Sequence, residues 1–438
     1  MSANHIHGNL TWLGEIPSYW DCKKIGSLFT ERKVKVSDKD YPPLSVAKIG
    51  IVPQLDSAVK TDAGDNRKLV RVGDFVINSR SDRKGSCGVS ELDGSVSLIN
   101  IVLTPRSEWN SRYVHYLLRS QPFSEEYYRN GRGIVADLWT TRYSEMKSIL
   151  LPIPPSPEQD QIVRFLDWKV SSINKLIGVK QRQISTLKEL MQAEIEKQLR
   201  VYPVVDTVRL KQLGTFFKGG GFSRDNLVEG GGYPAILYGD IYTQYEYKTS
   251  VITHSIDSNA YDVSRKIVKS DIVMAGTGET KDEIGKSILY MGDEVVAAGG
   301  DVIVFRPNEG INVEYLLYQL YSQATLKHRY IHGKGDIIVH IYPAALGNTL
   351  ISLSDEENQV KAVERINEII DQVKKAIATL TKEISILREF KTRLVADTVI
   401  GRIDVRGIKI PECEFVEETV DTENDESMEG MEGKTYEE

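Results

Sequence analysis

The sequence contains few cysteines and no long apolar segment. Cys22, Cys87 and Cys413 lie far apart, so they have neither the spacing of a zinc site nor the number needed for a disulfide framework. No run approaches the ~18 apolar residues that a membrane helix requires. Residues 1–14 lack both a basic segment and an apolar core, so we expect no signal peptide. These absences favour a cytoplasmic protein without a membrane anchor.

Motifs of the common catalytic and cofactor sites are also missing. The chain has no nucleophile elbow, zinc-protease helix or dinucleotide-binding fingerprint. Residues from Gly278 to Ser287 resemble a phosphate-binding loop, but its glycines stand too far apart to close around phosphates. His328 and His332, with His340 nearby, have no carboxylate or cysteine at ligand spacing, so we interpret them as surface or structural residues. We expect a non-catalytic chain that binds no metal or cofactor itself.

Charge is unevenly distributed along the 438 residues. Residues 411–438 contain twelve Asp and Glu and one Lys. Residues 1–410 therefore keep 54 of the 55 Lys and Arg and 50 of the 62 Asp and Glu, a net charge of +4. We interpret the C-terminal segment as an acidic, disordered tail because it is poor in large apolar residues. The mildly basic remainder permits nucleic acid as a partner.

An internal repeat organises the first 410 residues. Matching positions are separated by about 198 residues, and a separation this large indicates two related units rather than a short solenoid repeat. The matched pairs are Ser156 and Ser354, Tyr116 and Tyr315, Gly131 and Gly333, and Asp74 and Asp271. Ser156 and Ser354 each stand in a capping-box sequence, which predicts the start of a long helix.

Both long helices carry an apolar heptad pattern, which predicts a left-handed coiled coil. The first pattern runs through Leu166, Val170, Ile173, Ile177, Lys180, Ile184, Leu187 and Met191. The second runs through Val363, Ile366, Ile370, Val373, Ile377, Leu380, Ile384, Leu387, Lys391 and Leu394. Two repeats related by a pseudo-two-fold axis place their helices antiparallel, so the helices are expected to pair. Packing of each helix on its own globular unit is the alternative.

The globular units have an α+β pattern. Short apolar runs at residues 74–77, 98–103 and 302–305 predict strands bounded by turn residues. Residues 111–120 and 312–323 predict short helices. The expected fold class is α+β, with two pseudo-repeated α/β domains separated by two long antiparallel coiled-coil helices.

Loops that combine cations, small polar residues and glycine occur at equivalent positions of the two units. They are residues 79–85 and 129–133 in the first unit, and 275–286 and 327–336 in the second. Arg commonly reads guanine in the major groove, Lys and Ser mostly contact the backbone, and glycine permits close approach. We therefore predict that these loops bind DNA. The candidate residues are Lys48, Ser79, Arg80, Ser81, Arg83, Lys84, Arg132, Arg142, Lys218, Arg224, Tyr238, Lys281, Lys286 and Lys334.

Three further motifs carry a resemblance to a known family. Residues 12–20 read WLGEIPSYW, residues 151–159 read LPIPPSPEQ and residues 401–406 read GRIDVR. Together they resemble the N-terminal signature, the proline-rich approach to the first helix and the C-terminal motif of type I restriction-modification specificity subunits. The sequence departs from that pattern before the second helix, where residues 350–354 read LISLS, and in the acidic tail.

The resemblance implies two target recognition domains, at residues 1–155 and 203–353, which bind the halves of an asymmetric, bipartite sequence in double-stranded DNA. Residues 156–202 and 354–410 would form the spacer helices and the C-terminal motif, followed by the tail at 411–438. The helices would dock two modification (methyltransferase) subunits, together with restriction subunits. Residues 180–182 and 374–375 are candidate docking surfaces. S-adenosylmethionine, ATP and Mg, with adenine methylation and DNA cleavage, would belong to those partners.

Two other functions stay open at this point. The chain could be a free-standing protein that binds a bipartite DNA sequence without enzyme partners, in which case its affinity falls steeply with salt. It could also be a coiled-coil adaptor between proteins, for which the loop cations are incidental. Loss of DNA binding on replacing Arg80, Arg83 and Arg132 by alanine would exclude the adaptor.

Overall fold

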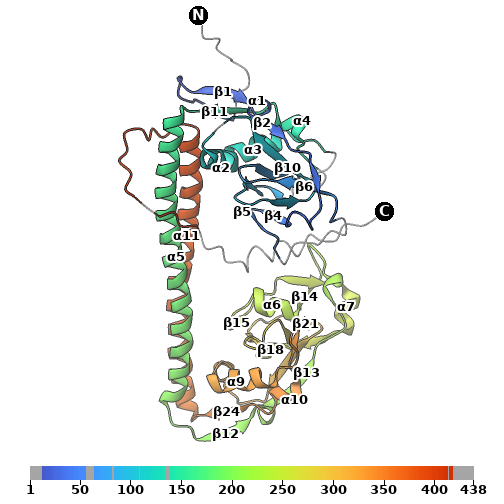
Figure 1. Cartoon of the computed structure of the whole chain (residues 1–438). Helices are drawn as coiled ribbons and strands as arrows, with labels where there is room; N and C mark the ends of the chain where they lie inside the picture. Colours follow the sequence, from blue (N-terminus) through green and yellow to red (C-terminus); the bar gives the residue numbers. More distant parts are fainter. Residues whose placement is uncertain are drawn as a thin grey trace, which may run out of the picture. The chain divides into compact units, whose positions relative to one another are not determined.

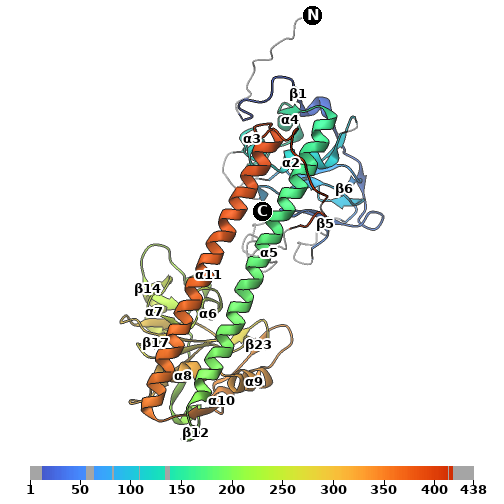
Figure 2. The same ribbon diagram turned by 90° about the vertical axis from the view of Figure 1, so that its left-hand side faces the viewer.

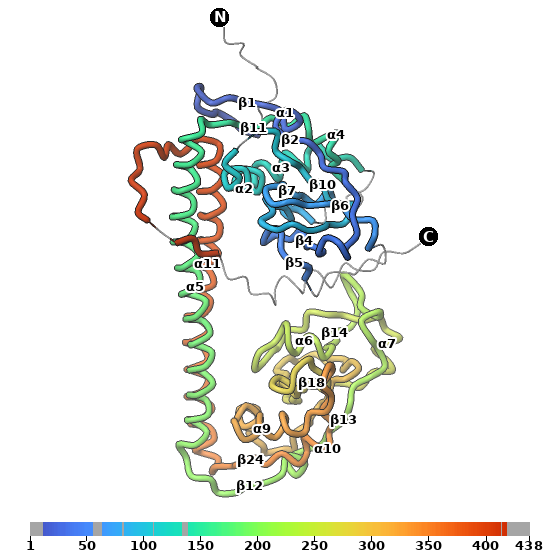
Figure 3. Tube along the Cα trace, in the orientation of Figure 1, coloured from blue at the N-terminus to red at the C-terminus, as the bar shows by residue number. Residues whose placement is uncertain are grey.

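The computed structural model describes residues 12–55, 64–80, 83–107, 109–133, 139–412 and 414–417. The chain divides into two compact units, residues 1–182 with 380–438 and residues 183–379. Each unit therefore contains one globular domain and parts of both long helices. Figure 3 shows the first unit combining the blue N-terminal strands with the red helical residues near the C-terminus.

The two long helices are α5 (Ser156–Val201) and α11 (Glu356–Val399), shown with the other elements in Figure 1. The strands of the first unit are β1 (Asp21–Lys24), β2 (Phe29–Glu31), β3 (Lys35–Val36), β4 (Leu44–Ala47), β5 (Gly50–Pro53), β6 (Arg67–Val70), β7 (Phe75–Asn78), β8 (Cys87–Val89), β9 (Gly94–Val96), β10 (Asn100–Pro105) and β11 (Leu150–Ile153). Its short helices are α1 (Ile25–Leu28), α2 (Ser111–Arg119), α3 (Gln121–Arg129) and α4 (Tyr143–Met146).

The second unit contains more short elements. Its strands are β12 (Asp206–Arg209), β13 (Gly214–Lys218), β14 (Tyr233–Ile236), β15 (Lys248–Thr249), β16 (His254–Ile256), β17 (Arg265–Ile267), β18 (Ile272–Ala275), β19 (Thr277–Gly278), β20 (Ser287–Tyr290), β21 (Val296–Ala298), β22 (Val302–Pro307), β23 (Val339–His340) and β24 (Leu350–Leu353). Its helices are η3 (Leu210–Gln212), η4 (Arg224–Asn226), α6 (Tyr238–Thr243), α7 (Ser258–Val263), α8 (Val313–Gln319), α9 (Gln323–His332) and α10 (Pro343–Leu346).

The same antiparallel sheet recurs in both units. The first unit has the strand order β2-β10-β7-β8, and the second has β13-β22-β18-β20 extended by β15. The central strands β7 and β18 are buried along their whole length, because apolar residues occupy both faces. A two-stranded antiparallel pair, β1 with β11 and β12 with β24, leads into α5 and α11 respectively. The repeat and the α+β fold class predicted from the sequence are confirmed.

Side-chain caps fix the register between the two copies. The Asn110 Oδ1 atom accepts a hydrogen bond from the Tyr113 N–H at 3.1 Å, and Asn312 does the same for Tyr315 at 3.0 Å. Tyr113 is therefore the counterpart of Tyr315, and the pairing of Tyr116 with Tyr315 was wrong. The error is one helical turn, because each helix carries two tyrosines three residues apart.

The start of α11 also differs from the prediction. Asp355, not Ser354, caps the helix, since its Oδ1 accepts from the Asn358 N–H at 2.9 Å. A carboxylate caps as well as a hydroxyl and adds a favourable interaction with the helix dipole. The Gln159 and Gln359 amides donate to the Pro154 and Ser354 carbonyls, five residues earlier in each case. Ser354 is therefore the counterpart of Pro154, and the pairing of Ser156 with Ser354 was wrong by two residues. Ser156 is the first residue within α5, so it does not cap that helix either.

The long helices pair antiparallel within each unit (Figure 2). In the first unit Lys180 forms an ion pair with Glu383, and the Lys391 Nζ lies 3.2 Å from the Asn174 Oδ1. In the second unit one apolar cluster contains Met191, Ile195 and Leu199 of α5, Ala362, Ile366 and Ile370 of α11, and residues of α8. The helices thus pack on each other and on the globular domain. None of the described helices is long and apolar enough to cross a membrane.

Equivalent polar contacts join each domain to the helix pair. In the first unit Asp167 of α5 accepts from the Arg112 Nε at 2.8 Å and from the Tyr116 hydroxyl at 2.7 Å. In the second unit Asn367 of α11 accepts from the Tyr318 hydroxyl and, at 2.7 Å, from the Lys248 Nζ. The two copies therefore hold their helices by the same tyrosine position and a different cation.

The three motifs that carry the family resemblance meet in the first unit. Glu158 at the start of α5 accepts from the Trp20 indole at 3.1 Å and from the Tyr19 hydroxyl at 2.9 Å. The Arg406 guanidinium lies 5.0 Å from the centre of the Tyr19 ring. Gly401 has φ +80°, and a Cβ there would lie 2.5 Å from Pro17, so only glycine fits. The motifs thus form one structural junction between N-terminal residues, α5 and the end of α11.

Residues 414–417 have a defined position, which differs from the expectation of a tail that is disordered from residue 411 onward. The Val416 N–H donates to the Ser171 Oγ at 2.9 Å, and its carbonyl accepts from the Asn174 Nδ2 at 2.8 Å. Phe415 packs on Arg112, with the guanidinium 4.0 Å from the ring centre. Two apolar side chains within the acidic sequence explain this local order. Residue 413 and residues 418–438 lie outside the described residues.

Candidate nucleic-acid interface

Two loops predicted to bind DNA are brought together in the first unit. Residue 79 follows β7, and the loop at 130–133 follows α3. Thr140 joins them, since it forms bridges with both Arg80 and Arg132. The Arg132 N–H donates to the Thr140 carbonyl at 2.8 Å, and the Thr141 N–H donates to the Ser79 carbonyl at 3.0 Å. The backbone of residues 140 and 141 therefore pairs with both loops, and we call it the backbone support of Arg80 and Arg132.

The second unit repeats this arrangement with different side chains. The Ile341 N–H donates to the Gly276 carbonyl at 2.9 Å, as Thr141 does to Ser79 in the first unit. Lys334 and His340 exchange two backbone hydrogen bonds of 2.9 and 2.8 Å. The His340 Nδ1 lies 2.9 Å from the Thr277 hydroxyl. The equivalence of residues 79–85 and 276–282, inferred from the sequence, agrees with these contacts.

The candidate residues near these supports differ in exposure. The Arg132 side chain is 85% exposed and lies 3.9 Å from the carboxylate of Glu145. Lys84 is exposed and lies 5.5 Å from the Tyr128 ring centre. Lys334 is exposed, whereas Arg80 and Arg83 are partly buried. Ser81 lies outside the described residues. The most accessible cations of the two loop groups are thus Arg132, Lys84 and Lys334.

A cavity of about 540 Å³ lies beside the first loop group. Its lining includes two candidate residues, Ser79 and Arg142, and three further cations, Lys33, Lys68 and Lys147. Burial lowers the pKa of Lys68, whose Nζ donates to the Asn100 carbonyl at 2.7 Å. Glu31 also lines the cavity and pairs with Lys33 at 3.1 Å, so four cations surround one carboxylate, an excess of positive charge that suits a phosphate backbone.

Of the remaining candidates, Lys281 and Lys286 belong to the loop at 275–286, and the others lie outside the loop groups. Lys48 lies in the turn between β4 and β5, Lys218 ends β13, and Arg224 lies in η4. Tyr238, at the first position of α6, is 39% exposed, and Lys281 is partly buried. Lys286 is directed inward, since its Nζ donates to the Tyr242 carbonyl at 3.1 Å and burial lowers its pKa. Its present contacts suit a structural role.

The loop between Lys334 and His340 also presents residues that the sequence analysis did not select. Ile337 is 89% exposed and Ile338 is 56% exposed. The backbone pairing of Lys334 with His340 closes this loop, and Gly335 turns it with φ +114°. Val339 is buried and anchors one side. In the sequence, the adjacent residues Ile337 and Ile338 between Lys334 and His340 were the signal that could have identified this loop as a binding surface.

The motifs judged inactive from the sequence have structural roles. Ser287 begins strand β20 rather than a helix, so the phosphate-loop geometry is absent there. The His328 Nε2 contacts the Ala345 carbonyl at 2.9 Å, and the His332 Nδ1 contacts the His328 carbonyl at 2.8 Å. Among the described residues, no group of three or more His, Cys, Asp and Glu side chains could hold a metal ion.

Comparison with known proteins gives the family. Residues 204–386 match the model of the type I restriction modification DNA specificity domain. A solved chain described as "Structural basis underlying complex assembly and conformational transition of the type I R-M system" is similar to 89% of this chain and 100% of its own, with 16% identity and a TM-score of 0.62. This similarity supports the fold. No curated protein was found to match the chain.

Two further solved structures show weaker similarity. The HsdS subunit from Thermoanaerobacter tengcongensis matches 89% of this chain and 98% of its own, with 17% identity and a TM-score of 0.41. The type I S subunit from M. genitalium matches 88% of this chain and 96% of its own, with 17% identity and a TM-score of 0.34. At these scores no common overall fold is inferred.

The repeated domains and the family match define a class of protein that recognises specific DNA sequences. Residues 204–386 carry a type I restriction modification DNA specificity domain, and the recurrence of the same sheet in the first unit extends this domain plan to the rest of the chain. Specificity subunits of this family are generally non-catalytic. The match of residues 204–386 agrees with the family resemblance found in residues 12–20, 151–159 and 401–406.

Proposed function

We propose that each unit binds one half of a bipartite DNA sequence and that the helix pair docks two modification subunits. The observation that carries the proposal is the repeated loop arrangement, in which Thr140 and His340 each join two distant loops. The partners would supply S-adenosylmethionine-dependent adenine methylation, and restriction subunits would supply ATP-dependent cleavage. The chain itself selects the sequence on which they act.

The target of this proposal is asymmetric. At equivalent positions the first unit carries Arg80 and Arg132, whereas the second carries Thr277 and Lys334. Arginine binds guanine through two parallel hydrogen bonds from a planar, rigid guanidinium, whereas lysine offers a single flexible ammonium group and threonine a neutral hydroxyl. Different side chains on the same support therefore favour different bases in the two halves.

Ile337 is expected to contact a thymine methyl group in the half bound by the second unit. An apolar side chain at the tip of a closed loop has no partner among the described residues, and the C5-methyl is the apolar feature of the major groove. Ile337→Ser should lower affinity for the target about 5- to 10-fold, in line with a single mismatch. Fluorescence anisotropy with target DNA measures this loss.

Deoxyuridine in place of the contacted thymine removes only the methyl group and provides the matched comparison. The unsubstituted protein should lose affinity on this DNA, whereas Ile337→Ser should bind both DNAs equally. Ile331→Ser is the control variant, since Ile331 is 63% exposed on α9. An equal loss from both isoleucine variants would contradict the assignment.

An exposed apolar patch on the helix pair supports partner docking. It consists of Leu176 and Val179 of α5 with Ile386 and Phe390 of α11, which are between 42% and 55% exposed. With Val170 of α5 and Ile384 of α11 at position a, Leu176 and Phe390 occupy position g. Val179 and Ile386 then occupy position c. The antiparallel contacts of Lys180 with Glu383 and of Asn174 with Lys391 place them at matching levels. Contiguous exposed apolar residues commonly mark protein interfaces.

Replacing both Ile386 and Phe390 by aspartate is expected to remove one of the two docked modification subunits. Two charges in a desolvated interface leave unpaired groups that weaken binding strongly. Native mass spectrometry of the co-expressed proteins should then show one modification subunit per chain. Glu389→Gln, on the adjacent exposed position, should keep two. Two subunits bound to the aspartate variant would exclude this patch as a docking surface.

The free-standing DNA-binding protein is the second candidate function. The same loops would support it, but the exposed apolar patch favours a protein partner. Failure of the modification subunit to co-purify, with sequence-specific DNA binding retained, would favour that candidate.

A further inference from the structure

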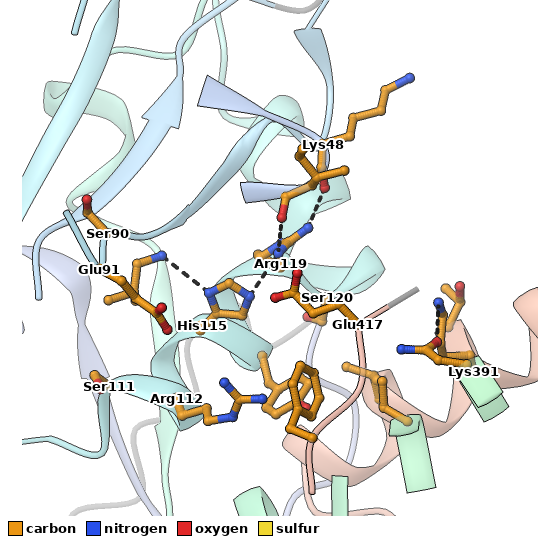
Figure 4. Close-up of a pocket in the computed structure, with 18 of the residues that line it drawn as sticks. Lys48, Ser90, Glu91, Ser111, Arg112, His115, Arg119, Ser120, Lys391 and Glu417 are labelled. Atoms are coloured by element: carbon orange, nitrogen blue, oxygen red, sulfur yellow. Dashed lines mark hydrogen bonds between the residues drawn. The ribbon is translucent and has the colours of Figure 1, made fainter. Parts of the chain in front are cut away.

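The first unit contains a second cavity, of about 740 Å³ (Figure 4), which is lined by the candidate residue Lys48 but by no residue of the loops at 79–85 and 129–133. It is lined by the turn between β4 and β5, by α2, by α5 and α11, and by the C-terminal segment at residues 415 and 417. The chain's own C-terminal residues thus form part of its wall.

The cavity wall carries positive charge. Its cations are Lys48, Arg112, Arg119 and Lys391, and outside the C-terminal segment its only acidic residue is Glu91. Arg112 is paired with Asp167. Arg119 contacts only neutral groups, namely the carbonyls of residues 48 and 49 and the His115 Nε2 at 2.8 Å. The guanidinium of Arg119 therefore lacks a carboxylate partner among the described residues.

The His115 ring in the cavity wall carries no charge of its own. Its Nδ1 lies 3.4 Å from the Val89 N–H, and Figure 4 shows its ring between that group and Arg119. Burial, together with the charges of Arg119 and Arg112, lowers its pKa to about 3. The imidazole is neutral at physiological pH, so the guanidinium of Arg119 lies beside a neutral ring, whereas Arg112 is paired with Asp167 and Lys391 contacts the Asn174 Oδ1.

The C-terminal segment reaches this cavity in a fixed direction. The two hydrogen bonds of Val416 to α5 and the packing of Phe415 on Arg112 hold the chain at its rim. Glu417 lines the cavity directly. Residues 418–438 follow immediately and contain nine Asp and Glu and one Lys.

We propose that residues 418–438 bind in this cavity as an anionic ligand supplied by the chain itself. Two observations support it, the positive lining and the anchoring of the preceding residues at the rim. A short tether gives an effective concentration in the millimolar range, so even a weak carboxylate–guanidinium interaction keeps the site occupied. The bound segment also lowers the affinity of the first unit for DNA, because it neutralises nearby positive charge. This consequence rests on the proposed function.

The binding claim is tested without DNA. A peptide of residues 414–438 is titrated into the chain truncated after residue 413 and into the intact chain. Saturable binding to the truncated chain, at least tenfold weaker to the intact chain, supports intramolecular occupancy. The same peptide with its acidic residues replaced by Asn and Gln should not bind. Equal binding of the acidic peptide to both chains, or binding to neither, overturns the proposal.

The cavity is tested by Arg119→Gln in the truncated chain, which should weaken peptide binding at least tenfold. Arg164→Gln, an exposed cation of α5 outside the cavity, should leave it unchanged. Equal effects of both variants would place the peptide elsewhere. The charge-neutralised peptide keeps this test valid if Arg119→Gln folds poorly.

A separate titration with duplex DNA tests the consequence. Truncation after residue 413 should raise DNA affinity several-fold at low salt, and the gain should shrink as salt increases. If the peptide binds and truncation leaves DNA affinity unchanged, the segment occupies the cavity without affecting DNA. If truncation no longer raises DNA affinity once Arg119 is replaced by Gln, the cavity itself binds DNA phosphates. That result overturns the proposal that the cavity is a site for residues 418–438. Absence of DNA binding in every variant contradicts the proposed function but not the peptide result.

Discussion

Replacement of Arg80 and Arg132 by alanine together is expected to lower affinity for the target DNA about 100-fold or more. Each arginine that binds a base through two hydrogen bonds is worth about 1–3 kcal/mol of discrimination. The two arginines flank Thr140 on one backbone support, so both losses fall on the same half of the target. Electrophoretic mobility shift and anisotropy titrations against target and scrambled DNA measure the change.

Loss of the Arg132 side chain should change stability little. The Arg132 side chain is 85% exposed and its contact with Glu145 spans 3.9 Å, so this pair contributes little. Arg164→Ala is the matched control, because Arg164 is an exposed arginine of the same unit outside the loops. Lys334→Ala should weaken binding through the other half only. Unchanged DNA affinity in the double variant would favour the coiled-coil adaptor instead.

Asp271→Ala is expected to lower the free energy of unfolding of the second unit by about 2–4 kcal/mol. Asp271 is 1% exposed and accepts from the Arg306 Nε and Nη2 at 2.8 and 2.7 Å. Its Oδ2 also accepts from the Val268 N–H at 2.8 Å. Removal leaves a guanidinium and a backbone donor without this partner at the start of β18, the strand that leads to the loop at 276–286. Chemical denaturation monitored by circular dichroism measures the loss.

Lys269→Ala provides the comparison for this prediction. Its ion pair with Asp293 joins two exposed side chains at 2.8 Å, so its loss should change stability far less than the loss of Asp271. Asp74 occupies the equivalent position in the first unit and is bound by Arg32. Asp74→Ala should therefore destabilise the first unit in the same way. Similar effects of Lys269→Ala and Asp271→Ala would contradict this account.

The sequence predicted those elements whose physical cause is local. The turn aspartates Asp74 and Asp271 follow from a repeated five-residue pattern, and the structure shows that both anchor a buried strand. The heptad pattern predicted that the long helices pair, because an apolar seam of that length must be covered, and the internal repeat predicted that they run antiparallel. The cation and glycine loops were predicted at equivalent positions, and the backbone contacts of Ser79 and Gly276 agree with that equivalence.

Other features depend on contacts between distant residues and could not be read from a pattern. The segments around Thr140 and His340, which join the loops, have no distinctive composition. Helices α3 and α9 were not predicted separately from α2 and α8, because each begins almost where the preceding helix ends: Ser120 both ends α2 and begins α3, and Ser322 begins α9 two residues after Leu320 ends α8. The position of residues 414–417 depends on Phe415 meeting Arg112, which charge composition alone obscures.

The central claim is that one chain specifies a two-part DNA sequence for modification subunits. The most direct measurement co-expresses the chain with its modification subunit in a host without DNA methylation and maps modified adenines by single-molecule sequencing. The account predicts one asymmetric, bipartite motif with a modified adenine in each half. Absence of a motif, together with failure of the chain and the modification subunit to co-purify, would contradict it.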